Sequence, residues 1–346
     1  MDKEYPKVSI MIPTYNRAHF LAEAIESALM QDYPNLEVIV SDNASTDNTR
    51  ECVQRYLTDP RFRYYRNDEN LGSSANYERL LYEYAAGVYG QYLTDDDVLL
   101  DREHVSKAMR IVREHGVKVV FSAAVSRYEG IDREGKSLSL GLPEVVPRQW
   151  WLDNICTIKL GLTYFPSCGS GTVFEIQRAK DLGAFKEGLY YNDYEFAVKC
   201  ILLDEKTGYI KESSYLERRH PGQDGRTSVY NAYRGTMIFQ RIYEFGAELG
   251  MDHETIDRIR LRGFVCFTRS FFLHNWLNER GKSFRSFAGF MRELRGIDRR
   301  LPSAILCDPY CMIQFAIYNS RLHMALTRLI RFVRSSALGL YLRRKG

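Results

Sequence analysis

The chain is organised around one segment, which reads Gly90-Gln91-Tyr92-Leu93-Thr94-Asp95-Asp96-Asp97-Val98-Leu99-Leu100. A short β-type run ends there in three consecutive carboxylates, the acidic triplet. Adjacent negative charges repel one another, so a strand end holds three of them only where a positive partner lies close. Oxygen-rich clusters of this kind suit a hard divalent cation such as Mg²⁺ or Mn²⁺. The alternative is a solvated acidic turn that caps the following helix, since Asp is a favoured N-cap residue.

Short apolar runs alternate with helical patterns before this segment. Strands are expected at residues 8–13, 36–40, 62–65 and 91–94, and helices at residues 20–29, 52–57 and 75–86. This alternation predicts a parallel sheet with helices on both faces, in which ligands bind beyond the carboxyl ends of the strands. Three polar loops, residues 14–17, 41–43 and 95–97, follow such ends and are expected to converge on one crevice. Their convergence favours a binding site over a helix cap.

Two common nucleotide-binding patterns do not occur in the sequence. No G-x-G-x-x-G follows the first predicted strand, and G-x-x-x-x-G-K-[ST] is found nowhere. The run Gly169-Ser170-Gly171 is too short a glycine pattern to indicate a phosphate loop. The usual dinucleotide-binding and P-loop folds are therefore not expected.

The composition is that of an ordinary globular protein of 346 residues, 45% hydrophobic and 27% charged. Its net charge of +4 is too small to indicate nucleic acid, so no nucleic-acid partner is expected. The seven cysteines are scattered without a C-x-x-C pair, which favours reduced thiols over zinc or disulfides. No apolar run reaches membrane-spanning length, and the first residues lack the apolar region of a signal peptide. We therefore expect a cytoplasmic protein.

Several motifs in the first hundred residues resemble one family in their order and spacing. They are Val8-Ser9-Ile10-Met11-Ile12-Pro13-Thr14-Tyr15-Asn16, Val38-Ile39-Val40-Ser41-Asp42-Asn43-Ala44-Ser45-Thr46-Asp47, Asn70-Leu71-Gly72, Asn76, and the strand leading into the acidic triplet. Together they look like the nucleotide-binding half of a family-2 glycosyltransferase of GT-A fold. The resemblance implies an α/β fold with a mixed, mainly parallel sheet flanked by helices, and inverting transfer of a sugar from a nucleotide-sugar donor. A C-terminal helical extension is expected beyond it.

The resemblance also implies roles for matching residues. The expected donor-binding residues are Pro13, Thr14, Tyr15, Asn16, Asp42, Asn70, Asn76, Asp95 and Asp96. Pro13, Thr14 and Asn16 would line the base and ribose pocket, and Asp42 would accept a hydrogen bond from the pyrimidine. Asp96 is the favoured ligand of a Mn²⁺ or Mg²⁺ cofactor. The family often reads Leu-Asp-x-Asp-Asp here, whereas this chain has Thr94 at the first Asp position. The division of roles therefore stays open, with Asp97 a second metal ligand or a cap.

Asp193 is the candidate general base for the acceptor hydroxyl. A base for this reaction is a carboxylate or imidazole near the reacting centre. From the residues alone, Asp193 is equally an ordinary N-cap at a predicted helix start. Family members place a Glu-Asp or x-Asp pair about a hundred residues after the acidic motif, with the Asp as base; here Asn192 replaces the first acid. Glu195 is the reserve candidate.

The segment Tyr215–His220 resembles the "Tyr-Arg-x-His" end of the family's catalytic domain. His220 is the expected phosphate or metal contact, which makes Asp96, Asp97 and His220 the predicted metal set. Arg218 and Arg226 are expected either in a basic loop that closes on a diphosphate or in a solvated surface loop.

The predicted organisation is a catalytic domain, residues 1–228, followed by a helical region, residues 229–346. Within the catalytic domain, residues 1–100 form the nucleotide-binding half and residues 101–228 the acceptor-binding half. In the second half we expect a strand at 117–122, a hairpin or flap at 127–147, a helix opening at Trp150 and ending near residue 160, and a strand at 209–210. The helical region is expected to break at Gly250, Gly281 and Pro302.

The last residues form a basic amphipathic pattern. Leu322, Leu326 and Leu329 share one arc of a helical wheel, and Arg321 and Arg328 lie opposite. Such a helix, at 321–345, suits an anionic membrane surface, which would make the protein peripheral at the inner face of the cell membrane. The alternatives are a helix packed on the catalytic domain or a dimer contact, so oligomerisation stays open.

The predicted function is transfer from a UDP-sugar, or next a dTDP-sugar, to a saccharide or lipid-linked saccharide acceptor. This reaction would build surface polysaccharide or lipid-linked oligosaccharide. Two alternatives stay open. One is a non-catalytic nucleotide-sugar or glycan-binding module, which would not need a base such as Asp193. The other is a sugar-phosphate nucleotidyltransferase, which would need a glycine- and arginine-rich loop where this chain has Thr14-Tyr15-Asn16-Arg17.

Overall fold

The computed structural model divides into two compact units, residues 1–225 with 237–260, and residues 226–236 with 261–346. It describes residues 5–128, 136–137, 139–155, 158–159, 162–163, 169–186, 192–220, 229–275, 289, 291–292, 294–308 and 311. The predicted segments 221–228, with Arg226, and 321–345 lie outside the described residues.

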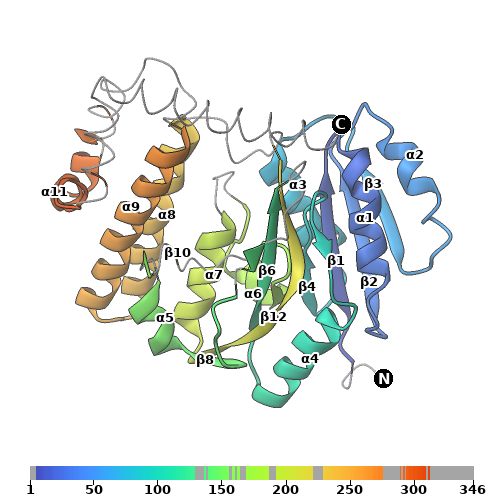
Figure 1. Cartoon of the computed structure of the whole chain (residues 1–346), viewed down its shortest axis with the longest axis horizontal. Coiled ribbons are helices and arrows are strands. Elements are labelled where there is room, and N and C mark those ends of the chain that lie inside the picture. Colours follow the sequence, from blue (N-terminus) through green and yellow to red (C-terminus); the bar gives the residue numbers. More distant parts are fainter. Residues whose placement is uncertain are drawn as a thin grey trace, which may run out of the picture. The chain divides into compact units, whose positions relative to one another are not determined.

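The first unit is built on one mixed sheet (Figure 1). Its strands are β1 (Val8–Thr14), β2 (Leu36–Asp42), β3 (Phe62–Arg66), β4 (Tyr89–Tyr92), β5 (Val98–Leu99), β6 (Val119–Tyr128), β7 (Lys136–Ser137), β8 (Val145–Pro147), β11 (Val173–Glu175) and β12 (Lys206–Arg219). They follow the order β3-β2-β1-β4-β11-β6-β12-β5, with β7 on β6 and β8 on β12. Strands β1 to β4 are parallel, as are β6 and β12, whereas β11 runs antiparallel to β4 and β6. A separate pair joins β9 (Ile158–Lys159) and β10 (Leu162–Thr163).

Helices connect and cover these strands. They are α1 (Ala18–Leu29), α2 (Thr49–Gln54), α3 (Ser73–Arg79), the π-helix η1 (Leu80–Tyr84), α4 (His104–His115), α5 (Arg148–Asn154), α6 (Ile176–Asp181), α7 (Asn192–Leu203), α8 (Val229–Glu248), α9 (His253–Asn275) and α11 (Arg300–Leu306). Helices α8 and α9 lie side by side (Figure 1), and a side chain on Gly246 of α8 would meet Ile256 of α9. The mixed sheet with flanking helices confirms the predicted fold class.

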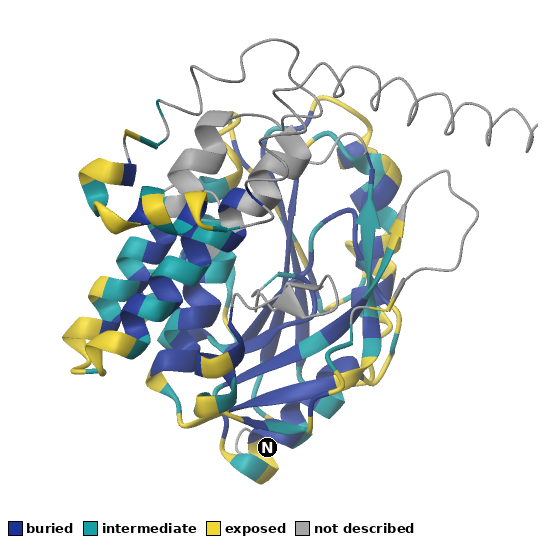
Figure 2. Cartoon of the chain, turned by 60° about the vertical axis from the view of Figure 1, so that its left-hand side comes forward, coloured by how far each residue is buried: buried dark blue, intermediate teal, exposed yellow. Residues whose placement is uncertain are grey.

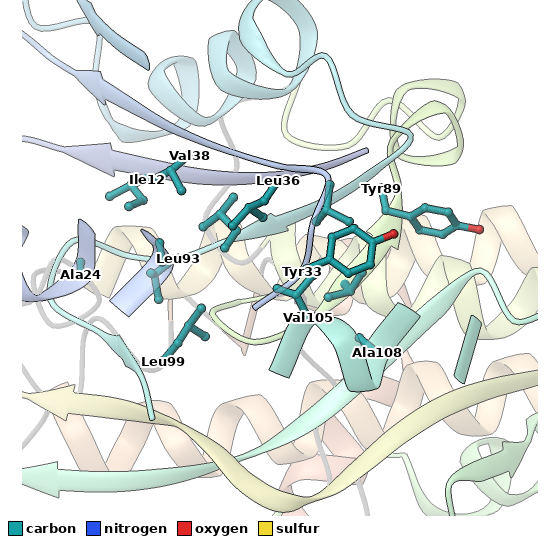
Figure 3. Packing of buried hydrophobic residues seen from close by; sticks show 14 of the residues in the cluster. Ile12, Ala24, Tyr33, Leu36, Val38, Tyr89, Leu93, Leu99, Val105 and Ala108 are labelled. Atoms are coloured by element: carbon teal, nitrogen blue, oxygen red, sulfur yellow. The ribbon is translucent and has the colours of Figure 1, made fainter. Parts of the chain in front are cut away.

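The core lies where β1 and β2 meet α1 and α4. Every residue of β1 and β2 is buried, as their near-continuous apolar runs require of strands covered on both faces. Figure 3 shows Ile12 and Val38 from these strands in one cluster with Ala24 from α1 and Val105 from α4. Strands β1, β2 and β4 are buried along their whole length, and Figure 2 shows buried strands through the middle of the sheet. This packing holds the carboxyl ends of β1, β2 and β4 in place.

Three predicted boundaries are wrong. Strand β6 runs to Tyr128 rather than ending at residue 122, and β12 begins at Lys206 and reaches Arg219 rather than covering 209–210. β6 and β12 pair with each other along most of their length. This backbone pairing extends each strand into residues whose sequence has little of the alternation typical of a strand. Helix α5 ends at Asn154 rather than near residue 160, because Ile155 is already extended. All three errors come from long-range pairing or local backbone geometry that sequence periodicity does not report.

Pro302 does not break a helix. It is the third residue of α11, in the first turn. Backbone N–H groups in the first turn have no intrahelical acceptor, so proline loses no helix hydrogen bond there. The position at which we predicted a helix break, Pro302, therefore lies in the first turn of a helix.

Candidate active site

The acidic triplet follows β4 and is followed at once by β5. Helix α4 begins only at His104, with Glu103 in the N-cap position. The interpretation of the triplet as a cap of the following helix is therefore wrong. Asp95, Asp96 and Asp97 are 3%, 4% and 5% exposed. Buried carboxylates are costly unless they are paired or hydrogen-bonded, so the surrounding residues must compensate them.

Asp95 is held by the loop after β1. Its Oδ2 accepts a hydrogen bond from Thr14 Oγ1 at 2.7 Å, and its Oδ1 accepts one from Arg17 Nη1 at 3.0 Å. Thr14 is the last residue of β1, which pairs with both β2 and β4. The expected convergence of the loops after β1 and β4 is confirmed by these contacts.

Asp96 lies between two basic side chains. Its Oδ2 is 3.3 Å from Arg17 Nη1 and 3.0 Å from His220 Nε2. His220 follows β12, is buried, and packs its ring against Phe20 of α1 with 4.9 Å between centroids. Arg17 was not among the predicted site residues. The signal that would have found it is a basic residue in a loop at the carboxyl end of a parallel strand.

Asp97 has hydrogen-bond partners of its own. Its Oδ1 accepts a hydrogen bond from the backbone N–H of Arg218 at 3.0 Å, and the hydroxyls of Ser170 and Thr94 also bond to its carboxylate. Arg218 lies near the end of β12, and its guanidinium pairs with Glu23 of α1 at 2.6 Å.

Residues 169–171, set aside as too short a glycine pattern, border the triplet. Ser170 Oγ accepts a hydrogen bond from the Thr94 N–H at 3.0 Å. Gly171 has φ +89°, and a Cβ there would lie 2.4 Å from the ring of Tyr215 and 2.6 Å from Ser122 Oγ. Glycine is required because the backbone approaches β12 and β6 this closely. The two glycines around a serine are a signal of close backbone approach that the sequence analysis undervalued.

Burial raises the pKa of two carboxyl groups of the triplet. It raises the pKa of Asp95 to about 6, although the guanidinium of Arg17 opposes the rise. Burial and the neighbouring Asp96 also raise the pKa of Asp97. A rise of this kind reflects the free-energy cost of a charged carboxylate in a buried site. Carboxylate oxygens with an imidazole nearby fit a hard divalent cation in type of ligand and in charge.

The predicted pyrimidine contact, Asp42, ends β2 and is fully buried. Its Oδ2 accepts a hydrogen bond from the Tyr64 hydroxyl at 2.7 Å, and its Oδ1 accepts one from the Ser45 N–H at 2.8 Å. Asn16 has φ 54°, a left-handed conformation that asparagine tolerates, and its Oδ1 accepts a hydrogen bond from the Thr46 N–H at 2.7 Å. The loops after β1 and β2 are thus bonded to each other.

The remaining predicted donor residues differ in exposure. Pro13 is buried in β1, whereas Tyr15 beyond it is 43% exposed. Asn76 of α3 is 2% exposed and braces β2, since its Oδ1 accepts a hydrogen bond from Ser41 Oγ and its Nδ2 donates one to the Ser41 carbonyl. Asn70 is exposed, and its Oδ1 accepts a hydrogen bond from Asn43 Nδ2 at 2.8 Å.

Asp193 is the second residue of α7, as predicted, and is partly exposed. The ring of Tyr77, from α3, is stacked on Phe185 with 5.5 Å between centroids. Burial raises the pKa of Tyr77, and the negative charges of the acidic triplet and of Asp193 raise it further. The phenol of Tyr77 therefore lies within electrostatic range both of the triplet and of Asp193.

Glu195 has a different environment. It is 4% exposed, and its Oε1 pairs with Lys199 Nζ at 2.6 Å and with Arg241 Nε at 3.0 Å. The pair with Lys199 lies within α7, and the pair with Arg241 joins α7 to α8, so the carboxylate has a structural role. The reserve candidate for the base is therefore less suited to the role than Asp193.

A second acidic group among the described residues lies at the end of α4. The ligand atoms of Glu114, His115 and Glu144 are all within 4.8 Å of one another. The guanidinium of Arg110 pairs with both glutamates and already supplies their countercharge.

Within the described part of the chain, no helix is long and apolar enough to cross a membrane. The cysteines described there, Cys52, Cys200, Cys266, Cys307 and Cys311, are free thiols.

Several known proteins resemble this chain in amino-acid sequence. The family model described as Glycosyl transferase family 2 matches residues 9–176. The uncharacterized glycosyltransferase RT0329 of Rickettsia typhi is 31% identical over 230 residues, which cover 65% of this chain and 67% of that protein. A GalNAc(5)-diNAcBac-PP-undecaprenol beta-1,3-glucosyltransferase of Campylobacter jejuni is 28% identical over 256 residues, covering 72% of this chain and 78% of that protein.

Solved structures share the fold. TarS 1–349 of S. aureus, in complex with UDP-GlcNAc, matches with a TM-score of 0.66 at 17% identity, over 90% of this chain and 91% of that one. The mannosyltransferase PcManGT of Pyrobaculum calidifontis, in complex with GDP-Man and Mn²⁺, matches with a TM-score of 0.50 at 17% identity, over 96% of this chain and 86% of that one. Sequence relatives and fold agree, and the chain belongs to glycosyltransferase family 2, with the GT-A fold.

Proposed function

We propose that this glycosyltransferase moves a sugar from a nucleotide-sugar to an acceptor hydroxyl with inversion at the anomeric carbon. One observation carries the proposal. Three buried carboxylates lie at the end of β4, the loop after β1 braces them, and Asp193, in the first turn of α7, lies within electrostatic range of the same tyrosine, Tyr77. Donor anchor and base are thus held by separate rigid elements, as a displacement between two substrates requires.

The donor is proposed to be a UDP-sugar, with a dTDP-sugar next. Pro13, Thr14, Tyr15 and Asn16 at the end of β1 would line the base and ribose pocket, and Asn70, Asn76 and Asp95 would support the donor. Asp42 would accept a hydrogen bond from the pyrimidine. Because each carboxylate oxygen has two lone pairs, Asp42 can accept that bond while it keeps those from Tyr64 and Ser45. The UDP-GlcNAc complex of the TarS structure supports this choice of nucleotide.

A divalent cation, Mn²⁺ or Mg²⁺, is proposed as the cofactor, held by Asp96, Asp97 and His220. When bound, such a cation stabilises the negative charge that develops on the leaving diphosphate. The raised pKa of Asp95 and the burial of its two neighbours support the proposal, since a bound cation would offset the cost of holding charged carboxylates in a buried site. The Mn²⁺ in the PcManGT structure also supports it.

Asp193 is proposed as the general base. It removes the proton of the acceptor hydroxyl while the oxygen attacks the anomeric carbon on the face opposite the leaving group. Its partial exposure at the start of α7 leaves it accessible to an acceptor, whereas Glu195 is buried between two cations. Single displacement from the opposite face inverts the configuration.

The acceptor is proposed to be a saccharide or a lipid-linked saccharide, in the synthesis of surface polysaccharide or lipid-linked oligosaccharide. The undecaprenol diphosphate in the name of the Campylobacter relative supports a lipid-linked acceptor. Residues 1–228 are proposed as the catalytic domain, with nucleotide-binding and acceptor-binding halves meeting near residue 100. Residues 229–346 would form the helical region, whose basic segment 321–345 would contact the membrane surface.

Hydrolysis and transfer assays with a panel of nucleotide-sugars test the proposal. With Mn²⁺ present, we expect nucleoside diphosphate release to be fastest with one UDP-sugar and to depend on the cation. Donor binding without release would favour the non-catalytic binding module. Release of inorganic pyrophosphate from a nucleoside triphosphate and a sugar phosphate would favour the nucleotidyltransferase.

A further inference from the structure

The guanidinium of Arg17 contacts two carboxylates of the acidic triplet, one of which is a proposed metal ligand. A single nitrogen, Nη1, contacts Asp95 Oδ1 at 3.0 Å and Asp96 Oδ2 at 3.3 Å. The two carboxylate side chains are 4% and 5% exposed, so this countercharge acts where water screens little. Arg17 therefore shares one positive charge between the two carboxylates that the resemblance to the family identifies as the donor and metal anchor.

Arg17 occupies the N-cap position of α1. Its carbonyl accepts hydrogen bonds from the Phe20 and Leu21 N–H groups at the start of α1. Its side chain is 21% exposed, so part of it faces solvent. A substitution of this side chain leaves the backbone contacts at the start of the helix in place.

A divalent cation on Asp96 would compete with this contact. Asp96 Oδ2 already accepts from Arg17 Nη1 and lies 3.0 Å from His220 Nε2. A metal ion bonds to carboxylate oxygens at about 2.0–2.6 Å, a position that a guanidinium nitrogen at hydrogen-bond distance from the same oxygens would crowd. The positive charges of the ion and the guanidinium would also repel each other.

We propose that Arg17 is the resident counter-ion of Asp95 and Asp96 and that it is exchanged for the divalent cation when the donor site is loaded. The proposal rests on the metal site of the proposed function. In the donor-free protein the guanidinium supplies positive charge to both buried carboxylates. On exchange it leaves the two oxygens and stays, on its 21% exposed side, at the edge of the site. Arg17 is thus a positioning residue that sets how strongly the empty site binds a cation.

The test is a titration of the donor-free, full-length chain with Mn²⁺, with unbound Mn²⁺ measured by electron paramagnetic resonance at mildly alkaline pH. We expect Arg17→Gln to bind Mn²⁺ about tenfold more tightly than the wild type. A tenfold change in affinity corresponds to the free energy of one hydrogen bond between charged groups. Arg17→Lys keeps the charge but loses the planar group and should fall between them. If Arg17→Gln does not fold, Arg17→Lys still tests the proposal. A Mn²⁺ affinity of Arg17→Lys equal to that of the wild type would count against exchange.

Arg55→Gln is the matched control. Arg55 pairs with Glu26 and its side chain is 59% exposed, so the change removes one positive charge outside the triplet. Its Mn²⁺ affinity should equal that of the wild type. Equal or weaker binding by folded Arg17→Gln, with Mn²⁺ bound by the wild type, would refute the exchange and leave the metal site standing. Absence of Mn²⁺ binding in all four proteins would refute the metal site, and the exchange with it.

Discussion

His104 makes the stability of the first unit depend on pH. It is the first residue of α4, is fully buried, and its Nδ1 lies 2.9 Å from Ser214 Oγ of β12. Burial lowers its pKa from 6.5 to about 4, a fall that Asp101 opposes and Lys107 reinforces. The folded chain therefore prefers the neutral imidazole, because charging the ring inside the core would cost solvation energy.

The magnitude follows from the two pKa values. They differ by about 2.5, which at about 1.4 kcal/mol for each pKa unit gives about 3 kcal/mol. Because the pKa is lower in the folded state, the unfolded chain binds the proton first as the pH falls. The contribution of neutral His104 is complete above pH 6.5 and is lost progressively down to about pH 4. Asp95, whose pKa is raised to about 6, acts in the opposite direction over part of this range.

Chemical denaturation at several pH values, followed by far-UV circular dichroism, separates these contributions. His104→Gln keeps a polar side chain but cannot titrate, so the difference in unfolding free energy between wild type and variant should shrink by about 3 kcal/mol as the pH falls from 6.5 to 4. His253→Gln is the control, since His253 is exposed and bonded to the Tyr243 hydroxyl. A wild-type minus His104→Gln difference that is independent of pH would refute the reasoning.

Further predictions concern the site and the basic tail. Asp193→Asn should reduce the transfer rate by about 10²–10⁴-fold, and a full rate in a coupled nucleoside diphosphate assay would reject Asp193 as the base. Asp96→Ala should abolish the Mn²⁺-dependent part of donor binding by calorimetry; donor affinity that responds to Mn²⁺ as in the wild type would argue against Asp96 as ligand. Gly171→Ala should destabilise the fold by roughly 2–4 kcal/mol, because its Cβ would lie 2.4 Å from the Tyr215 ring at a positive φ; an unchanged denaturation midpoint would contradict this. A chain lacking residues 309–346 should float with anionic vesicles less than the full chain, and equal flotation would dismiss the tail as a membrane contact.

The N-terminal half of the fold could be predicted because its signals are local. The strands β1 and β2 are continuous apolar runs, and α1 repeats its apolar residues at helical spacing. Polar residues directly after parallel strands must lie at one edge of a sheet, which is why Thr14 and Asp95 could be expected together. The second half was less predictable, since β6 and β12 form most of their length through pairing with each other.

By itself the sequence determined the strand and helix alternation, the acidic triplet at the end of β4, and Asp193 at the start of a helix. Only the tertiary structure decided what surrounds the triplet. His220 meets Asp96 across 124 positions of sequence, and Ser170 meets Thr94 across 76. Those contacts follow from the order β4-β11-β6-β12, in which β11 and β12 lie on either side of β6. Local periodicity reports which face of a strand is buried but not which strand lies next to it. Thr14 and His220 could be expected near the triplet, whereas Arg17 and Ser170 emerge as its partners only from the folded chain.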